Sequence, residues 1–393
     1  MSRGSVAGSG WLLLCRPGFE AECAAEAVAQ WRGRGGGAPQ VTRGEGWARL
    51  RFPRTALEPA GVSFVALVFA RQGCWLADGI ETQPFDGPQG VLERLPQWLA
   101  AVPGVTEILV EAPDGEAARR LWPACRSLQE RLEGAVSPAR RGSQEGLRLH
   151  LVLMTTGEVE VGVAPLEGSS PLAGGIPRLR HSREAPSRSA LKLEEALKFF
   201  LGEEGSRLLR PGMRAVDLGA APGGWSWVLA RRGLQVVAVD NGPLGRGALD
   251  TGLVDPLRAD GYTYRPERPV DWLVCDMVAP PARVAKLVGL WARRGLCRRA
   301  VFNLKLPSGD RLAELRRCET IIRRELAAGG GSCELRFKHL YHDREELTGY
   351  LVVEGVVGNP PARTRTPPGP RGRQGRKAGS EAGGGRRRGH RAG

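Results

Sequence analysis

The chain has 393 residues, 41% of them apolar, and its 57 basic and 42 acidic side chains give a net charge of +15. This length exceeds the usual size of one hydrophobic core and predicts about two or three packed domains. Its longest apolar run, residues 62–70, is too short to span a bilayer, and residues 11–15 lack the length and cleavage site of a secretory signal, so we expect a cytoplasmic protein with no membrane partner.

The positive charge is concentrated at the C-terminus. Residues 360–393 hold ten arginine or lysine residues against one glutamate, which is nine of the fifteen net positive charges. We expect residues 358–393 to form a disordered Arg/Gly/Pro-rich tail, since they contain no large apolar side chains that could offset the entropy of ordering. Two interpretations remain open, a nonspecific RNA-binding arm and a low-complexity end without function.

The N-terminal half alternates between strand and helix patterns. Expected strands are 11–15, 47–52, 63–75, 107–110 and 146–154, and expected helices are 20–31, 92–101 and 116–132. This half is therefore a mixed α/β region, and it contains no obvious catalytic constellation. Glycines and prolines in residues 166–186 predict a connection to a second half.

The C-terminal half repeats a strand and helix alternation of another kind. A helix over 189–201 precedes a strand over 213–219, a glycine-rich turn, a helix over 225–232 and a strand over 234–240. Further strands are expected at 270–275 and 300–305. This alternation predicts an α/β fold with a doubly wound, Rossmann-like parallel sheet.

The turn DLGAAPGGWS, residues 217–226, follows the first strand of this half, where backbone amides can approach a ligand. Its glycines, Gly219, Gly223 and Gly224, match neither GxGxxG nor a P-loop, which disfavours dinucleotides and nucleoside triphosphates. Asp240 ends the second strand, where a carboxylate can accept hydrogen bonds from ribose hydroxyls. The pattern therefore predicts an adenosine-containing ligand.

The same turn resembles the S-adenosylmethionine motif of FtsJ-like 2′-O-ribose methyltransferases. In order, the longer runs APSRSALKLEEAL, AVDLGAAPGGW, VAVDNGP, DTG, VCDMV, FNLKLP and LYHDREELT resemble the M-type family that methylates a cytidine of bacterial 23S rRNA. They cover most of residues 185–353. The glycine-rich insertions and the basic tail depart from the compact family pattern, which puts RNA affinity in doubt and leaves catalysis untouched.

The resemblance implies a domain organisation and a cofactor site. Residues 1–55 would form a ferredoxin-like piece, 56–165 a THUMP-like RNA-binding domain, 166–186 a linker and 187–357 the S-adenosylmethionine-dependent methyltransferase domain. The residues that it places around the cofactor are Ser189, Asp217, Ala221, Pro222, Gly223, Gly224, Asp240, Asp260 and Asp276.

The resemblance also implies a Lys-Asp-Lys-Glu tetrad, formed here by Lys192, Asp276, Lys305 and Glu346. A ribose hydroxyl ionises far above neutral pH, so methyl transfer needs alignment and a base. We expect Lys305 to be that base and Lys192 to be the like charge that favours its neutral form. Taken singly, Lys192 on a Lys/Glu-rich helix has the simpler reading of a solvated residue, and whether Glu345 or Glu346 is the acid stays open.

These observations together predict an S-adenosylmethionine-dependent rRNA (cytidine-2′-O-)-methyltransferase that acts on 23S rRNA, free or in an assembling large subunit. We expect a monomer with no metal, because the eight cysteines are scattered and the histidines of HLYH, residues 339–342, fit a strand edge or turn better than a ligand pair. Two alternatives are a 2′-O-methyltransferase of another RNA and a noncatalytic RNA-binding or ribosome-assembly factor. The target nucleotide is not readable from composition or spacing.

Overall fold

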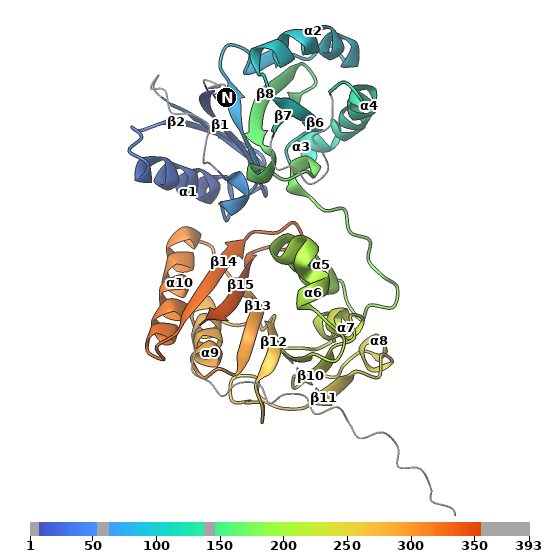
Figure 1. Ribbon diagram of the computed structural model, residues 1–393, viewed down its shortest axis with the longest axis vertical. Coiled ribbons are helices and arrows are strands. Elements are labelled where there is room, and N and C mark those ends of the chain that lie inside the picture. Colours follow the sequence, from blue (N-terminus) through green and yellow to red (C-terminus); the bar gives the residue numbers. More distant parts are fainter. Residues whose placement is uncertain (1–7, 53–62, 137–145, 355–393) are drawn as a thin grey trace, which may run out of the picture. The chain divides into compact units, whose positions relative to one another are not determined.

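The computed structural model of the protein describes residues 8–52, 63–136 and 146–354, which form two β-sheets with helices packed on them (Figure 1). The boundary predicted at residue 55 and the tail predicted from residue 358 lie outside the described residues. The elements of the first half are β1 (Gly8–Cys15), α1 (Glu20–Gly33), β2 (Gln40–Gly44), β3 (Trp47–Arg51), η1 (Phe64–Ala66), β4 (Ala70–Ala77), β5 (Thr82–Pro84), α2 (Pro88–Ala101), β6 (Val105–Glu111), α3 (Glu116–Arg119), α4 (Trp122–Leu132), β7 (Leu147–Thr155), β8 (Glu158–Pro165), η2 (Leu166–Gly168) and η3 (Ala173–Gly175).

The first sheet has the strand order β2-β3-β1-β4-β8-β7-β6, and β5 pairs with β8. Strand β1 pairs antiparallel with β3 and β4, whereas β6 lies at an edge and pairs in parallel with β7. Trp11 of β1 lies at the centre of an aromatic cluster and makes edge-to-face contacts with Trp31, Phe64 and Trp75. Such pairs add to the stabilisation that comes from burying the rings.

Two predicted elements of this half are wrong in detail. The helix expected over 116–132 is divided into α3 and α4, because Pro123 lies in the first turn of α4, where a missing backbone N–H costs no hydrogen bond. The strand expected over 63–75 begins as the 3-10 helix η1, and the strand itself is β4. The fully buried Phe64 of η1 supplies the apolar signal that extended the predicted strand.

The second half forms the other sheet. Its elements are α5 (Ala190–Leu201), η4 (Gly202–Glu204), α6 (Gly205–Leu208), β9 (Arg214–Leu218), α7 (Gly224–Ala230), β10 (Gln235–Val239), α8 (Arg246–Leu249), β11 (Val254–Leu257), β12 (Val270–Cys275), α9 (Pro281–Arg293), β13 (Cys297–Lys305), α10 (Arg311–Ala327), β14 (Ser332–Lys338) and β15 (Glu346–Glu354). The order is β11-β10-β9-β12-β13-β15-β14; the first five are parallel, and β15 is antiparallel to both of its neighbours.

The central strands of this sheet are buried on both faces. In β12, Trp272 and Val274 belong to the core formed with α5 and α7, whereas Leu273 and Cys275 belong to the core formed with α9 and α10. Near-continuous apolar runs are the expected pattern for a parallel sheet that helices cover on both sides. The structure thus confirms the predicted doubly wound α/β fold.

Strand β9 lies between β10 and β12. The chain proceeds from β9 to β10 and β11 toward one edge of the sheet and then returns to β12 on the other side of β9, so the strand order reverses at this point. Ligands of open α/β sheets bind outside the carboxyl ends of the strands at this point of reversal. Among the helices that the structure describes, none is long and apolar enough to cross a membrane.

Candidate functional site

Charged side chains gather at the carboxyl ends of the adjacent strands β10, β9, β12 and β13. Asp217 belongs to β9, Asp240 and Asp276 follow β10 and β12, and Lys305 is the last residue of β13. Because these strands are parallel, their carboxyl ends meet at one edge of the sheet. The residues predicted for cofactor binding and for catalysis are therefore neighbours in space.

The loop between β9 and α7 brings the backbone closer to its surroundings than side chains would allow. Gly219 and Gly223 have φ angles of +79° and +105°, which favour glycine. A Cβ added to Gly224 would lie 2.5 Å from the Oγ atoms of Ser187 and Ser189. The exposed Pro222 lies between these glycines. Bare backbone at the start of a helix suits a ligand that needs a close approach.

Asp240 closes the other side of this loop. Its carboxylate accepts hydrogen bonds from the backbone amides of Ala221 (3.0 Å) and Gly242 (2.7 Å). It also lines a cavity of about 290 Å³ between the ends of β10 and β11. Asp260 is exposed after β11 and accepts a hydrogen bond from the amide of Tyr262 (2.9 Å). The cavity and the two acids offer a polar site where a ribose could be held.

Asp217 lies at the base of the loop and is fully buried. One carboxylate oxygen accepts a hydrogen bond from the Ser226 hydroxyl (2.7 Å), whereas the other has no hydrogen-bond partner among the described residues. Burial raises the pKa of this carboxyl to about 7, and the nearby Asp276 and Asp240 act in the same direction. A buried oxygen without a partner fits a site completed by a ligand's donor group.

Ser189 connects the loop to α5. Its Oγ lies 2.6 Å from the Oγ of Ser187, and its carbonyl accepts a hydrogen bond from the indole N–H of Trp225 (3.0 Å). Trp225 is buried, as expected for a packing residue. This bond ties the start of α5, three residues before Lys192, to α7.

Lys192, Asp276, Lys305 and Glu346 lie together, and we call them the lysine–carboxylate cluster. The Nζ of Lys305 lies 2.9 Å from Asp276 Oδ1 and 3.7 Å from Glu346 Oε2. The Nζ of Lys192 lies 3.5 Å from Asp276 Oδ2 and also forms an ion pair with Glu346. Each lysine therefore faces both carboxylates, and two positive charges share two negative charges.

The cluster is half-buried, which strengthens these interactions. Side-chain exposure ranges from 8% for Glu346 to 25% for Lys305. Burial lowers the pKa of the Lys192 ammonium group, but Asp276 and Glu346 outweigh it, so the pKa lies above the usual value. Lys192 consequently stays charged at neutral pH.

The pairing of β13 with β15 distinguishes Glu346 from Glu345. Lys305 and Glu346 are directly opposite in the antiparallel register, so their side chains share a face of the sheet. The Glu345 side chain is 63% exposed and forms an ion pair with Arg311 at 2.9 Å. Glu346 is the acid that the structure brings to the two lysines.

A hydrogen-bonded chain behind the cluster was not predicted from the sequence. Asn303 donates to Asp276 Oδ1 (3.1 Å) and accepts from the hydroxyl of Thr348 (2.9 Å), which also contacts the buried Asp343. Burial raises the pKa of Asp343 well above its usual value. Asn303 precedes Lys305 by two residues, so strand alternation was a signal that could have placed both on one face.

Glu195 was also missed, and it holds the loop between β14 and β15. Its buried carboxylate accepts hydrogen bonds from the backbone amides of Tyr341 and His342 (both 2.8 Å) and lies 2.6 Å from His342 Nδ1. Since Glu195 is one turn beyond Lys192 on α5, these bonds fix Lys192 relative to the start of β15.

The two histidines of HLYH have separate surroundings. His339 is buried, its Nε2 lies 3.1 Å from the carbonyl of Arg344, and burial lowers its pKa to about 3. His342 contacts Glu195 instead. Within the described ranges, no group of three or more histidine, cysteine or acidic residues has a geometry that could hold a metal ion.

Comparisons with known proteins identify relatives of both halves of the chain. The FtsJ-like methyltransferase family matches residues 185–289, and the RlmM ferredoxin-like domain matches residues 9–74. Ribosomal RNA large subunit methyltransferase M of Methylococcus capsulatus is 44% identical over 353 residues, which cover 87% of this chain and 97% of the relative. The protein of the same name from Aromatoleum aromaticum is 43% identical over 386 residues, with coverages of 91% and 98%.

A solved structure, TrmN from Thermus thermophilus, covers 88% of this chain and 99% of its own at 18% identity and a TM-score of 0.32, a similarity too weak to support inference. The two curated relatives instead match at more than 40% identity over nearly their whole lengths. The chain therefore belongs to the ribosomal RNA large subunit methyltransferase M family, and its methyl donor is S-adenosylmethionine.

Proposed function

We propose that the protein methylates the ribose 2′-hydroxyl of a cytidine in 23S rRNA. The observation that carries the proposal is the lysine–carboxylate cluster, in which Lys192 and Lys305 share Asp276 and Glu346 beside the glycine loop. The relatives' names support ribosomal RNA of the large subunit as the substrate. The cytidine and the 2′ position come from the family resemblance of the sequence.

Within the site, S-adenosylmethionine supplies an electrophilic methyl group on a sulfonium sulfur. Lys305 Nζ is the base and takes the proton of the ribose hydroxyl, which requires a neutral amine. Lys192 engages both carboxylates, so Lys305 shares Asp276 and Glu346 with a second cation. Asp276 and Glu346 orient the two ammonium groups.

The cofactor would be held by Ser189, Asp217, Ala221, Pro222, Gly223, Gly224, Asp240, Asp260 and Asp276. Asp240, beside its cavity, is placed to accept hydrogen bonds from ribose hydroxyls. The Asp217 oxygen that has no partner among the described residues would accept a hydrogen bond that supports the glycine loop, near the methionine end of the bound S-adenosylmethionine. These roles come from the family resemblance of the sequence, and the position of Asp217, Asp240 and Asp276 at the carboxyl ends of strands supports them.

The N-terminal half would dock the RNA. We assign residues 1–55 to a ferredoxin-like piece, 56–165 to a THUMP-like RNA-binding domain, 166–186 to a linker and 187–357 to the methyltransferase domain. The family match over residues 9–74 supports a ferredoxin-like start to the chain. The enzyme would act as a monomer in the cytoplasm, on free 23S rRNA or an assembling large subunit.

The proposal is tested by mapping the product. Labelled S-adenosylmethionine is incubated with unmodified 23S rRNA, and methylated positions are found by resistance to alkaline cleavage. One alkali-resistant cytidine is the expected result. If the protein binds rRNA but transfers no methyl group to it or to tRNA, the assembly-factor alternative replaces this proposal, and a resistant tRNA nucleotide would redirect it to another RNA.

A further inference from the structure

A second cavity, of about 750 Å³, lies on the N-terminal sheet and far from the cofactor loop in sequence. Its walls are the edge strand β6, the helix α4 and the connecting segment 171–178. The floor is apolar, with the buried side chains of Ile108, Val110, Cys125 and Leu132. This volume lies within the range of about 300–1,000 Å³ that is common for ligand sites.

The rim of the cavity carries unbalanced positive charge. Arg119, Arg126 and Arg178 line it, are exposed, and form no ion pair or hydrogen bond with any residue that the structure describes. The acids on the rim are Glu133 and Glu107, and Glu107 is already paired with Arg148 at 2.8 Å. Free guanidinium groups around an apolar hollow favour a ligand with both phosphate charge and a flat apolar surface.

One wall offers a surface for stacking. The half-buried Trp122 lines the cavity, and the guanidinium carbon of Arg178 lies 4.6 Å from the centre of its ring. Unpaired bases stack on aromatic rings and on arginine planes, and this stacking tolerates any sequence. Arg178 covers one face of the Trp122 ring, so a nucleobase would stack on the outer face of this guanidinium plane or take its place on the ring.

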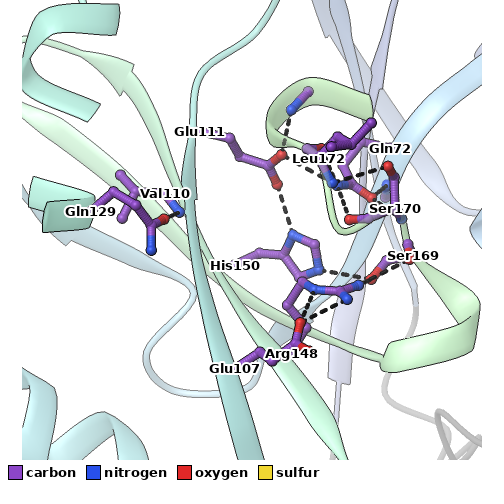
Figure 2. A network of polar contacts seen from close by, with 12 residues as sticks. Gln72, Glu107, Val110, Glu111, Gln129, Arg148, His150, Ser169, Ser170 and Leu172 are labelled. Atoms are coloured by element: carbon purple, nitrogen blue, oxygen red, sulfur yellow. Dashed lines mark hydrogen bonds and ion pairs between the residues drawn. The ribbon is translucent and has the colours of Figure 1, made fainter. Parts of the chain in front are cut away.

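The edge of β6 is closed to an added strand, which argues against a peptide. Gln129 of α4 accepts a hydrogen bond from the amide of Val110 (2.8 Å), which Figure 2 shows. It also donates one to the carbonyl of Ile108 (3.1 Å). A peptide that extended the sheet would need these same backbone groups.

The connecting segment is fixed at the base of the cavity. Glu111 accepts a hydrogen bond from the amide of Gly174 (2.7 Å) and lies 2.7 Å from His150 Nδ1, while Arg148 donates to the Ser169 hydroxyl (2.6 Å) (Figure 2). Gln72 donates to the carbonyl of Ser170 (2.9 Å). These buried bonds hold the wall in place before any ligand arrives, which lowers the entropy cost of binding.

We propose that this cavity binds an unpaired nucleotide of the RNA substrate, with the base stacked at Trp122 and Arg178 and the flanking phosphates held by Arg119 and Arg126. The inference rests on the proposed function in taking RNA as the substrate. It adds a second point of attachment, which recognises single-stranded RNA without methylating it.

The test uses the full chain and two matched double variants. R119A/R126A removes two charges of the cavity rim, whereas R120A/R131A removes two exposed charges of the same segment that do not line the cavity. Binding of a fluorescent single-stranded oligoribonucleotide is measured by anisotropy across a salt series, with the annealed duplex and a free mononucleotide as competitors. S-adenosylmethionine binding and ribose methylation are measured alongside.

We expect R119A/R126A to weaken single-strand binding by about tenfold and to make the slope of log affinity against log salt shallower by about 1.4, while R120A/R131A changes little. Equal losses in both variants, no loss in either, or equal competition by duplex or mononucleotide would each overturn the inference. If the wild type methylates ribose but both variants bind the oligoribonucleotide equally well, the cavity inference fails and the proposed function stands. Wild type that methylates no RNA removes the proposed function, and the oligoribonucleotide binding still decides the cavity.

Discussion

Replacing the buried Asp217 by asparagine should remove a large part of the pH dependence of stability. The carboxyl is fully buried, and burial raises its pKa to about 7 in the folded protein, against 3.8 as its ordinary value. Between these two values the folded state holds a proton that the unfolded state has released. The contribution of Asp217 to the free energy of unfolding therefore falls as the pH rises from about 4 to about 7 and is level above that.

The size of the effect follows from the shift. Three pKa units correspond to about 4 kcal/mol of lost stability above the folded-state pKa, and to none below about pH 4. In Asp217→Asn the amide oxygen can still accept from Ser226. The asparagine NH2 group takes the place of the second carboxylate oxygen, which has no partner within the described ranges, so its buried N–H groups lack an acceptor at a cost of about 1–3 kcal/mol. The variant should therefore be less stable than wild type near pH 4, and the difference should move in its favour by up to about 4 kcal/mol by pH 8.

Urea unfolding followed by circular dichroism, without S-adenosylmethionine and from about pH 4 to about pH 8, measures this difference. Asp250→Asn is the control, because Asp250 is exposed and its substitution should leave the profile unchanged. A profile for Asp217→Asn that runs parallel to wild type at every pH would refute the reasoning, since the buried carboxyl would then contribute no ionisation cost.

Three further substitutions test the site. Gly224→Ala places a Cβ 2.5 Å from two hydroxyl oxygens and should weaken S-adenosylmethionine binding about tenfold or more by calorimetry. Gly205→Ala is the control, because its Cβ would make only an ordinary contact with Leu201 at 3.8 Å, and unchanged affinity of Gly224→Ala would contradict the role of the loop. Glu346→Gln should lower kcat for methyl transfer about tenfold or more, while Glu345→Gln stays near wild type; equal losses would argue against the chosen acid. Lys192→Met removes one of the two cations that Asp276 and Glu346 hold and should lower kcat for methyl transfer about tenfold or more, with Lys198→Met as the exposed control; an unchanged kcat would argue against a role of Lys192 in the cluster.

The central sheet and the meeting of its strand ends could be predicted from the sequence. Apolar runs that end in Asp217, Asp240, Asp276 and Lys305 predict parallel strands, and parallel strands bring their carboxyl ends to one edge whatever the loops between them do. The chemical roles of these four residues could not be predicted in this way. It came from the family resemblance, because composition and spacing do not distinguish a catalytic lysine from a solvated one.

The rest depended on pairings between distant segments. The choice between Glu345 and Glu346 follows from the register of β15 on β13, which periodicity within ELTGYLVV leaves open by one residue. The buried Glu195 is one of two acids on α5, and its partners lie on a loop 146 residues later. The division of the helix expected over 116–132, in contrast, has a local cause, Pro123 in the first turn of α4, which the helical pattern of apolar residues alone does not reveal.

The central claim is that Lys305 acts as the base of a ribose methyltransferase. The most direct measurement compares single-turnover methyl transfer to unmodified 23S rRNA by wild type, Lys305→Ala and Lys286→Ala, an exposed lysine of α9. We predict that Lys305→Ala binds S-adenosylmethionine and rRNA normally but loses about a hundredfold or more of the methyl-transfer rate, while Lys286→Ala keeps it. A Lys305→Ala enzyme that methylates the ribose at the wild-type rate would contradict the account.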